Sequence, residues 1–192
     1  MATQQKNDPS GPVPEIHTER LLFRGHRLDD FEDCAALWGD PDVTRYVGGR
    51  PFTREEVWTR VLRYVGHWSL MGFGFWAVTE KSSGRFVGDV GFGEFKRDIR
   101  PSMEGYPEIG WVLAKWAHGR GLATEAVRAA TGWADTHLPA KRTVCLIIPE
   151  NGASLRVASK CGYSEFARTS YKNQPVTLFE RIKPQPANGR LD

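Results

Sequence analysis

The stretch Gly119-Arg120-Gly121-Leu122-Ala123-Thr124-Glu125 decides the fold, because it joins a strand-like run at 108–114 to a helical segment from Ala126 onward. The amide groups of a first helical turn lack intrahelical partners, and the helix dipole adds roughly half a positive charge there. Two glycines allow the backbone to approach a ligand closely. The stretch therefore predicts a binding site for a phosphate or pyrophosphate.

Two common phosphate-binding loops do not fit this stretch. A P-loop requires a Gly-Lys pair, and the segment contains none. The dinucleotide fingerprint would place its third glycine at Thr124, and no acidic residue about twenty positions on ends a second strand. After these two loops are excluded, the pattern to be explained is His118-Gly119-Arg120-Gly121-Leu122-Ala123.

Composition is that of an ordinary globular domain. The chain has 192 residues, of which 40% are hydrophobic and 26% charged, and its formal net charge is +3. Because the positive charge is mild and not clustered, it does not indicate nucleic-acid binding. The cysteines Cys34, Cys145 and Cys161 are odd in number and lack metal-ligand spacing, so we expect buried thiols in a reducing compartment and no metal site.

The ends of the chain differ from its middle. Residues 1–14 are polar and rich in proline and glycine, which predicts a disordered leader, and 184–192 is a polar tail without periodicity. A single domain is expected over 15–183. Without an apolar segment of spanning length, the sequence predicts no membrane association and a cytoplasmic location.

The first half of the domain is expected to contain a strand over 16–27 and two helices. Asp29 and Asp30 can cap the first helix, whose acids (Asp29, Asp30, Glu32 and Asp33) are expected on a solvated face. Thr53 and Glu56 form a capping box for the second. The expected core face of that helix consists of Val57, Val61, Leu62, Val65 and Trp68.

The second half alternates strands and helices. Strands are expected over 73–79 and 85–95 as a hairpin, then, after a loop over 96–107, at 108–114, 142–148, 163–169 and 175–182. One helix is expected from Ala126 to near Leu138, and the segment 149–154 leads into a second, short helix that ends at Cys161. The strand–helix–strand unit over 108–148 makes its two strands parallel. This order predicts an α/β fold with a mixed sheet.

Three segments together resemble one known family. They are Thr18 to Arg24, Glu108 to Ala123 and Asn151 to Tyr163, and the likeness extends from about Thr18 to Ile182. The chain is similar to the GCN5-related N-acetyltransferases (GNAT), and within them to the RimJ/RimL-like branch. The resemblance implies a central sheet of six or seven strands flanked by about four helices, with a parallel strand pair splayed at an acetyl-CoA site.

The resemblance also implies the residues that bind acetyl-CoA. The pantetheine arm would lie along Trp111, Val112 and Leu113, with Asn151 and Ser154 beside it. The pyrophosphate would meet the backbone amides from Gly119 through Arg120, Gly121, Leu122, Ala123 and Thr124. His118 stands where the family usually has Gln or Arg, which removes one expected contact.

Catalytic groups are less closely defined. Glu108 is the first choice for general base, Glu94 the second and Asp89 the third. The family's tyrosine acid is replaced by Ala158, which leaves Ser154, a water or no acid.

The acceptor is expected to be a primary amine on a peptide or small molecule. A peptide or protein N-terminal α-amine is favoured by the branch resemblance, with a small amine or polyamine possible. Phe52, Trp58 and Phe75 come from segments that cover the acceptor site in this branch. The alternatives are a non-catalytic acetyl-CoA sensor or interaction module, and an enzyme for longer acyl groups. A monomer or homodimer is expected.

Overall fold

The computed structural model describes residues 13–184. Most of the expected leader and tail, 1–12 and 185–192, lies outside the described residues. Val13 and Pro14, expected in the leader, instead contact the domain. Val13 packs against the main core, and the Trp76 indole donates a 2.8 Å hydrogen bond to the carbonyl of Pro14.

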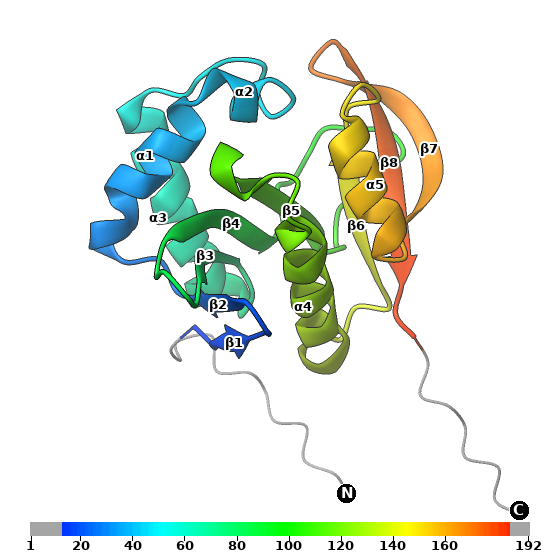
Figure 1. The fold of residues 1–192 in the computed structure, drawn as a ribbon. Coiled ribbons are helices and arrows are strands. Elements are labelled where there is room, and N and C mark those ends of the chain that lie inside the picture. Colours follow the sequence, from blue (N-terminus) through cyan, green and yellow to red (C-terminus); the bar gives the residue numbers. More distant parts are fainter. Residues whose placement is uncertain (1–12, 185–192) are drawn as a thin grey trace, which may run out of the picture.

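A mixed eight-stranded sheet forms the centre of the molecule, in the order β1-β2-β3-β4-β5-β6-β8-β7 (Figure 1). The expected α/β class is confirmed. The eighth strand arises because the single strand expected over 16–27 is a hairpin in which Ile16 pairs with Phe23. The strands are β1 (Ile16–His17), β2 (Leu21–Arg24), β3 (Phe75–Glu80), β4 (Phe86–Gly93), β5 (Glu108–Leu113), β6 (Arg142–Ile147), β7 (Ser164–Tyr171) and β8 (Gln174–Ile182).

The described residues form five α-helices, where about four were expected. They are α1 (Phe31–Gly39), α2 (Pro41–Thr44), α3 (Arg54–Met71), α4 (Leu122–His137) and α5 (Gly152–Lys160), with 3₁₀ turns at Leu28–Asp30 and Lys115–Ala117. The additional helix, α2, follows directly after α1 ends, because the Asp40 side chain caps it and Pro41 suits its first turn. Within residues 13–184, none of these helices is long and apolar enough to cross a membrane.

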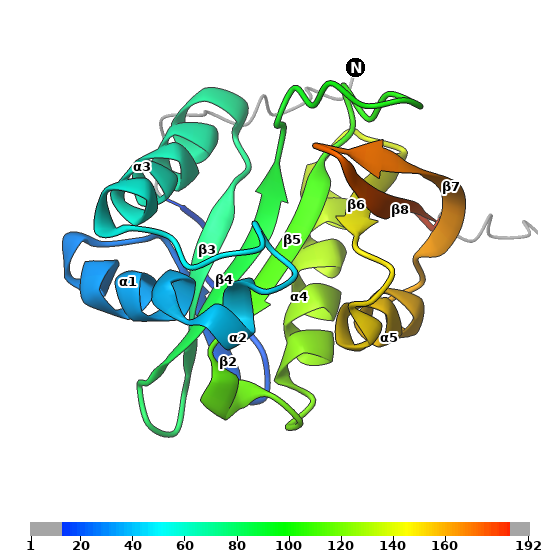
Figure 2. The ribbon, with the colours of Figure 1, turned by 90° about the horizontal axis from the view of Figure 1, so that it is seen from above.

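Helices cover both faces of the sheet (Figure 2). On one face, α1 and α3 pack over Ala77, Phe86 and Val112. On the other face, α4 packs against alternating residues of β2 to β5, with Leu122 and Ala126 fully buried. This layering holds the amino end of α4 next to the carboxyl end of β5.

The long helix α3 begins as expected and faces the core differently. Thr53 and Glu56 form the capping box, with the Thr53 side chain accepting from the Glu56 amide. The buried residues are Val57, Val61, Tyr64 and Trp68, whereas Leu62 and Val65 are 51% and 48% exposed, so their expected place in the core was wrong. The core stripe is narrower than predicted, and Tyr64 belongs to it.

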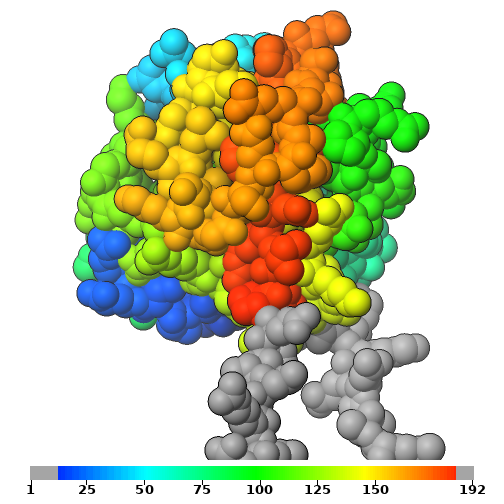
Figure 3. Space-filling model, turned by 90° about the vertical axis from the view of Figure 1, so that its right-hand side faces the viewer, coloured from blue at the N-terminus to red at the C-terminus, as the bar shows by residue number. Residues whose placement is uncertain are grey.

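Strands β5 and β6 are parallel and separate almost immediately. Their one register pair is Glu108 with Val144, which confirms the expected splayed pair. Beyond it, β6 continues with β8 and β7 as a smaller half-sheet. Figure 3 shows α5 and this half-sheet on one side of the molecule, with the 96–107 loop, in green, at its edge.

Candidate active site

The glycine turn after β5 has the conformation of an anion cradle. Gly119 and Gly121 adopt left-handed φ angles of 75° and 77°, and Gly121 is the N-cap of α4 without a side-chain cap. The amides at the start of α4 therefore have no capping side chain to satisfy them. This geometry fits the pyrophosphate site predicted from the sequence.

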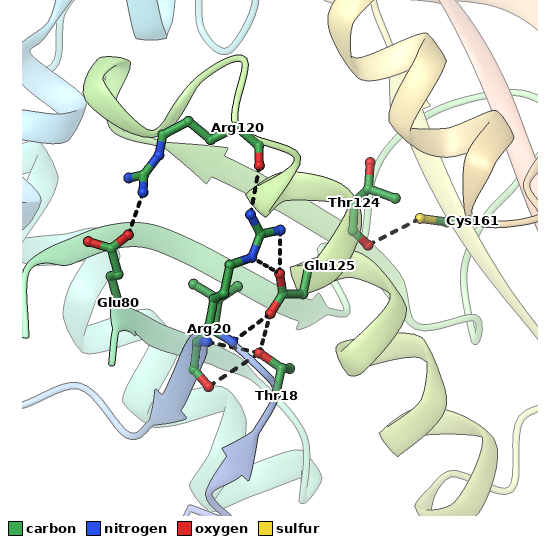
Figure 4. Close-up of polar contacts among 8 residues, drawn as sticks. Thr18, Arg20, Glu80, Arg120, Thr124, Glu125 and Cys161 are labelled. Atoms are coloured by element: carbon green, nitrogen blue, oxygen red, sulfur yellow. Dashed lines mark hydrogen bonds and ion pairs between the residues drawn. The ribbon is translucent and has the colours of Figure 1, made fainter. Parts of the chain in front are cut away.

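Three residues brace the cradle from outside (Figure 4). The Glu125 carboxylate accepts from the Thr18 hydroxyl at 2.6 Å, and from the Arg20 amide and Nε at 3.0 and 2.7 Å. Burial alone would raise the pKa of Glu125, but these bonds hold it below its usual value. Arg20 Nη1 also donates to the carbonyl of Arg120 at 2.9 Å. The sequence showed Thr18 and Arg20 only as part of the first resembling segment and gave no sign of this contact.

Arg120 contributes backbone and not charge to the cradle. Its guanidinium turns away to Glu80, at 2.7 Å (Figure 4). It also lies over the ring of Trp116. The local positive potential must therefore come from the amides and from other cations.

A cavity of about 540 Å³ opens beside the cradle. It is lined by every residue predicted for acetyl-CoA except Arg120: Trp111, Val112, Leu113, His118, Gly119, Gly121, Leu122, Ala123, Thr124, Asn151 and Ser154. Arg156 and Lys160 of α5 also line it. The sequence analysis missed these two cations, although their spacing of four places them on one helix face.

His118 and Asn151 both make contacts within the protein. His118 Nε2 donates to the Leu113 carbonyl at 2.8 Å, which ties the turn to the end of β5. Asn151 Oδ1 accepts from the Ser154 amide at 3.0 Å and caps α5. The cap fixes the Asn151 side chain and leaves its NH₂ group as a donor.

A second cavity of about 830 Å³ lies on the α1–α3 side of β5. Of the three aromatic residues proposed to cover the acceptor, Phe52 and Phe75 line this cavity and Trp58 does not. The two cavities share Tyr46, Val47, Trp111, Val112, Asn151 and Ser154. They are therefore two arms of one cleft that meet at the splayed strands. We refer to them as the cradle cavity and, for the role proposed for it below, the acceptor cavity.

Glu108 lines the acceptor cavity at the point where β5 and β6 part. Its carboxylate is held in a bidentate ion pair by Arg97, at 2.6 and 2.7 Å. Arg97 is itself placed by the rings of Phe95 and Tyr171. Although burial would lower the pKa of Arg97, its bonds with Glu108 raise it.

The other two acids have different surroundings. Glu94 lies just beyond the end of β4, lines the acceptor cavity, and accepts from the amides of Gly105 and Lys96 at 2.8 and 3.3 Å. Asp89 is fully buried and is not among the residues that line the cavity. Its oxygens accept from His26 and Trp38 at 2.9 and 2.7 Å, so Asp89 is a structural residue.

Asp89 also belongs to a buried group that the sequence did not suggest. Its oxygen and the ligand atoms of His26 and Cys34 lie within 4.8 Å of one another, which is a geometry that a metal ion could use. Burial raises the pKa of Cys34 well above its usual value, so the thiol stays protonated. Since Asp89 already has two donors and the thiol is neutral, the protein's own bonds account for this group.

Ala158 occupies the position of the expected acid and is fully buried. It packs in the main core with Cys161. Ser154 and Tyr46 are the hydroxyl groups that line both cavities. The sequence analysis did not find Tyr46, which reaches the cleft from the segment after α2.

A sheet with one splayed parallel pair and an anion cradle between strand and helix defines an acyltransferase of the coenzyme A type. Residues 20–164 match the family model described as Acetyltransferase (GNAT) domain, and the chain belongs to that family. Two relatives from Bacillus are an uncharacterized protein YkkB of B. subtilis, 32% identical over 87% of this chain and 95% of its own, and an uncharacterized N-acetyltransferase p20 of B. licheniformis, 27% identical over 78% and 82%.

Solved structures agree with the family assignment. A putative GNAT-family acetyltransferase from Bordetella pertussis superposes with a TM-score of 0.78 at 28% identity, covering 88% of this chain and 99% of that one. Two more distant structures share the fold. They are a spermidine N-acetyltransferase from Vibrio cholerae in complex with CoA and spermine (TM-score 0.69, 17% identity, 86% and 97% covered) and RimL, a ribosomal-protein acetyltransferase, in complex with coenzyme A (0.71, 15%, 88% and 98%).

Proposed function

We propose that this protein transfers an acetyl group from acetyl-CoA to a primary amine by direct attack. The observation that carries the proposal is the joined cleft, in which an anion cradle and a separate acceptor cavity meet at the splayed strands beside Glu108. Two neighbours of the same fold are described with coenzyme A bound, which supports the choice of thioester.

The chain offers a group for each part of acetyl-CoA. The backbone amides from Gly119 to Thr124 can donate hydrogen bonds to the pyrophosphate. Arg156 and Lys160 can bind the third phosphate of coenzyme A, which is attached to its ribose. Strand β5 is paired with β4 along one edge. Its other edge, which faces β6, has no strand partner beyond Glu108 in the described part of the chain, so it offers backbone groups to an extended pantetheine arm. An N–H of that edge would also stabilise the oxyanion that forms during attack.

Glu108 is the proposed proton acceptor, directly or through a water. Arg97 donates one hydrogen bond to each of its oxygens, which leaves the second lone pair of each oxygen to accept a proton from the amine or from a water. Glu94 is the alternative base, because it lines the same cavity with backbone donors only. Ser154 and Tyr46 are the proposed proton donors to the leaving thiolate, whose basicity is low enough for weak assistance to suffice.

The acceptor most consistent with the branch resemblance is a peptide or protein N-terminal α-amine. A small amine and a polyamine are the other classes. A non-catalytic acetyl-CoA sensor of the same fold is the rival function, motivated by His118 and Ala158 at positions where relatives carry polar groups for cofactor or acid.

The deciding measurement is release of free thiol from acetyl-CoA with a panel of peptides, amino acids, polyamines and aminoglycosides. We expect release that depends on at least one amine, together with a mass increase of one acetyl group on that amine. Binding of acetyl-CoA without release for any amine would identify a sensor. Replacing acetyl-CoA with longer acyl-CoAs in the same assay tests the acyl preference.

A further inference from the structure

The acceptor cavity has an excess of positive charge. Its lining contains five cations (Arg60, Arg63, Lys96, Arg97 and Lys172) and two carboxylates. One carboxylate, Glu108, is already paired with Arg97. Among the described residues, neither Arg60 nor Arg63 has a carboxylate within ion-pair distance. Such a cavity disfavours an acceptor with several positive charges.

Arg60 packs over two aromatic rings and has no anionic partner within residues 13–184. Its guanidinium lies 3.8 Å from the ring centroid of Trp38 and 4.7 Å from that of Phe52. Its Nε is buried and has no hydrogen-bond partner within residues 13–184. Arginine held between aromatic rings is preorganised to bind a planar anion through paired N–H groups.

Tyr64 presents a second donor one helical turn away. Its side chain is fully buried, and its ring stacks on Phe75 with centroids 4.5 Å apart. Its hydroxyl is another buried atom without a partner in the described structure. Burial and the charge of Asp89 raise the pKa of Tyr64, and together they outweigh the opposing charges of Arg60 and Arg63, so the phenol remains a proton donor. Arg60 Nε and the Tyr64 hydroxyl are therefore two neighbouring buried groups without a hydrogen-bond partner in the described structure, and leaving them so has a free-energy cost that a bound anion would remove.

These donors lie close to the reacting end of the cleft. Phe75, on which Tyr64 stacks, packs against Gly110 of β5 so closely that a Cβ there would meet its ring at 2.9 Å. One aromatic ring thus separates Tyr64 from the proposed cofactor strand. A group bound by Arg60 and Tyr64 must therefore belong to the acceptor itself, near its amine.

We propose that the acceptor amine carries a carboxylate and that Arg60 and Tyr64 bind it. This proposal rests on the proposed function, because it takes the second cavity to be the acceptor site. It favours an acceptor with a carboxylate over a polyamine. The carboxylate can come from a free amino acid or from an acidic residue at a peptide N-terminus. Both sources present the same chemistry to the two donors.

Binding of matched product analogues tests the proposal without requiring turnover. Calorimetry on the CoA-bound protein compares N-acetyl-L-phenylalanine with N-acetyl-L-phenylalaninamide, which lacks only the charge. We expect the carboxylate to bind at least about tenfold tighter, as charge-assisted hydrogen bonds imply. Arg60→Gln should abolish the preference, and Tyr64→Phe should reduce it by about threefold while keeping the ring. Arg54→Gln, on the exposed side of the same helix, should leave it unchanged.

Equal affinities in the parent protein, no binding of either compound, or a preference that survives Arg60→Gln would each overturn the proposal. Thiol release separates this result from the broader function. If thiol is released with neutral amines only, the carboxylate site is rejected and the acetyltransferase function stands. If the carboxylate compound binds selectively but no amine causes thiol release, the carboxylate site stands and the acetyltransferase function is rejected. The peptides Glu-Ala-amide and Gln-Ala-amide, compared with free glutamate, then show which source of carboxylate is used.

Discussion

Arg97 holds both carboxylate oxygens of Glu108, at 2.6 and 2.7 Å, at the residue pair where β5 and β6 separate. The pair lies in the wall of the acceptor cavity and not on the outer surface. It therefore fixes the orientation of the carboxylate proposed as base, and it links the 96–107 loop to the start of β5.

The ion pair predicts a non-additive effect on stability. Arg97→Gln leaves a largely buried carboxylate without its cation, which we expect to lower the free energy of unfolding by about 3 kcal/mol. The double variant Arg97→Gln/Glu108→Gln should be more stable than Arg97→Gln alone, because it removes the unpaired charge. Urea unfolding of the parent protein, Arg97→Gln, Glu108→Gln and the double variant measures the coupling. Additive losses would show that the two side chains do not interact in solution.

Glu108→Gln should lower turnover most at low pH. Without a base, only the amine that is already deprotonated can attack, and that fraction falls about tenfold for each pH unit below an α-amine pKa near 8. The measurement is kcat from pH 6 to 9 at saturating acetyl-CoA, with the affinity for CoA expected to stay unchanged. A profile identical to that of the parent protein would transfer the role to Glu94, to be checked with Glu94→Gln.

Gly121→Ala should weaken CoA binding beyond its effect on stability. Alanine at a left-handed φ costs about 1–2 kcal/mol wherever it occurs. Gly84→Ala is the matched control, since Gly84 has a φ of 69° in the hairpin turn between β3 and β4, away from the cradle. Both variants should lose similar stability in thermal unfolding, but only Gly121→Ala should bind CoA at least about tenfold more weakly. Equal CoA affinity in the two variants would locate the pyrophosphate elsewhere.

His118→Ala tests whether this ring serves the turn or the phosphates. Because His118 donates to the Leu113 carbonyl, its loss removes one ordinary hydrogen bond, and CoA affinity should fall by only about two- to tenfold. Calorimetric titration with CoA gives the value. A hundredfold loss would mean that the ring contacts the ligand directly.

Asp30 should make stability depend on pH in the acid range. It accepts two bonds from Arg24, at 2.6 and 2.7 Å, and one from the Arg27 amide. Burial alone would raise the pKa of Asp30, but these bonds hold it below its usual value. Because an unfolded aspartate titrates near 3.9, the stabilisation is complete above about pH 5 and is lost as the pH falls through the lower folded value.

The corresponding variant is Asp30→Asn. At pH 7 it should lower the free energy of unfolding by about 3 kcal/mol, and the difference from the parent should narrow toward pH 3. Glu32→Gln, which removes an exposed ion pair with Arg54, is the control and should change little at any pH. A difference for Asp30→Asn that stays constant from pH 7 to 3 would contradict this assignment.

Local signals in the sequence were sufficient for most elements. The Thr53 and Glu56 capping box and the glycine turn at 119–121 depend on neighbouring residues only, and each was located correctly. The hairpin of β1 and β2 was missed because its turn, at Thr18 to Arg20, contains no glycine, proline or asparagine. Asp30 was expected on a solvated helix face with three other acidic residues. The sequence contains no pattern that distinguishes it from them, although it is buried and paired with Arg24.

The part of the site that one local backbone segment forms could be predicted from the sequence. The part that depends on contacts between distant residues could not. The residues of the cradle follow from one continuous segment. By contrast, the structural role of Asp89 depends on His26, 63 positions away, and Arg60 would suit the solvated side of an amphipathic helix equally well. Only packing against Trp38 and Phe52 distinguishes its environment.

The single register pair between β5 and β6 has a mechanical consequence. Strands β1 to β5 and β6 to β8 share one register pair, Glu108 with Val144, and are otherwise held together by the common core and by contacts through α4, such as the ion pair of Asp135 with Arg181. A ligand bound between the diverging strands would contact both parts of the sheet, so it would fill the gap between them and also connect them. Because α4 packs against β2 to β5 and also holds β8 through the Asp135–Arg181 ion pair, the separation of the two parts of the sheet, and with it the width of the acceptor cavity, depends on the contacts of this helix.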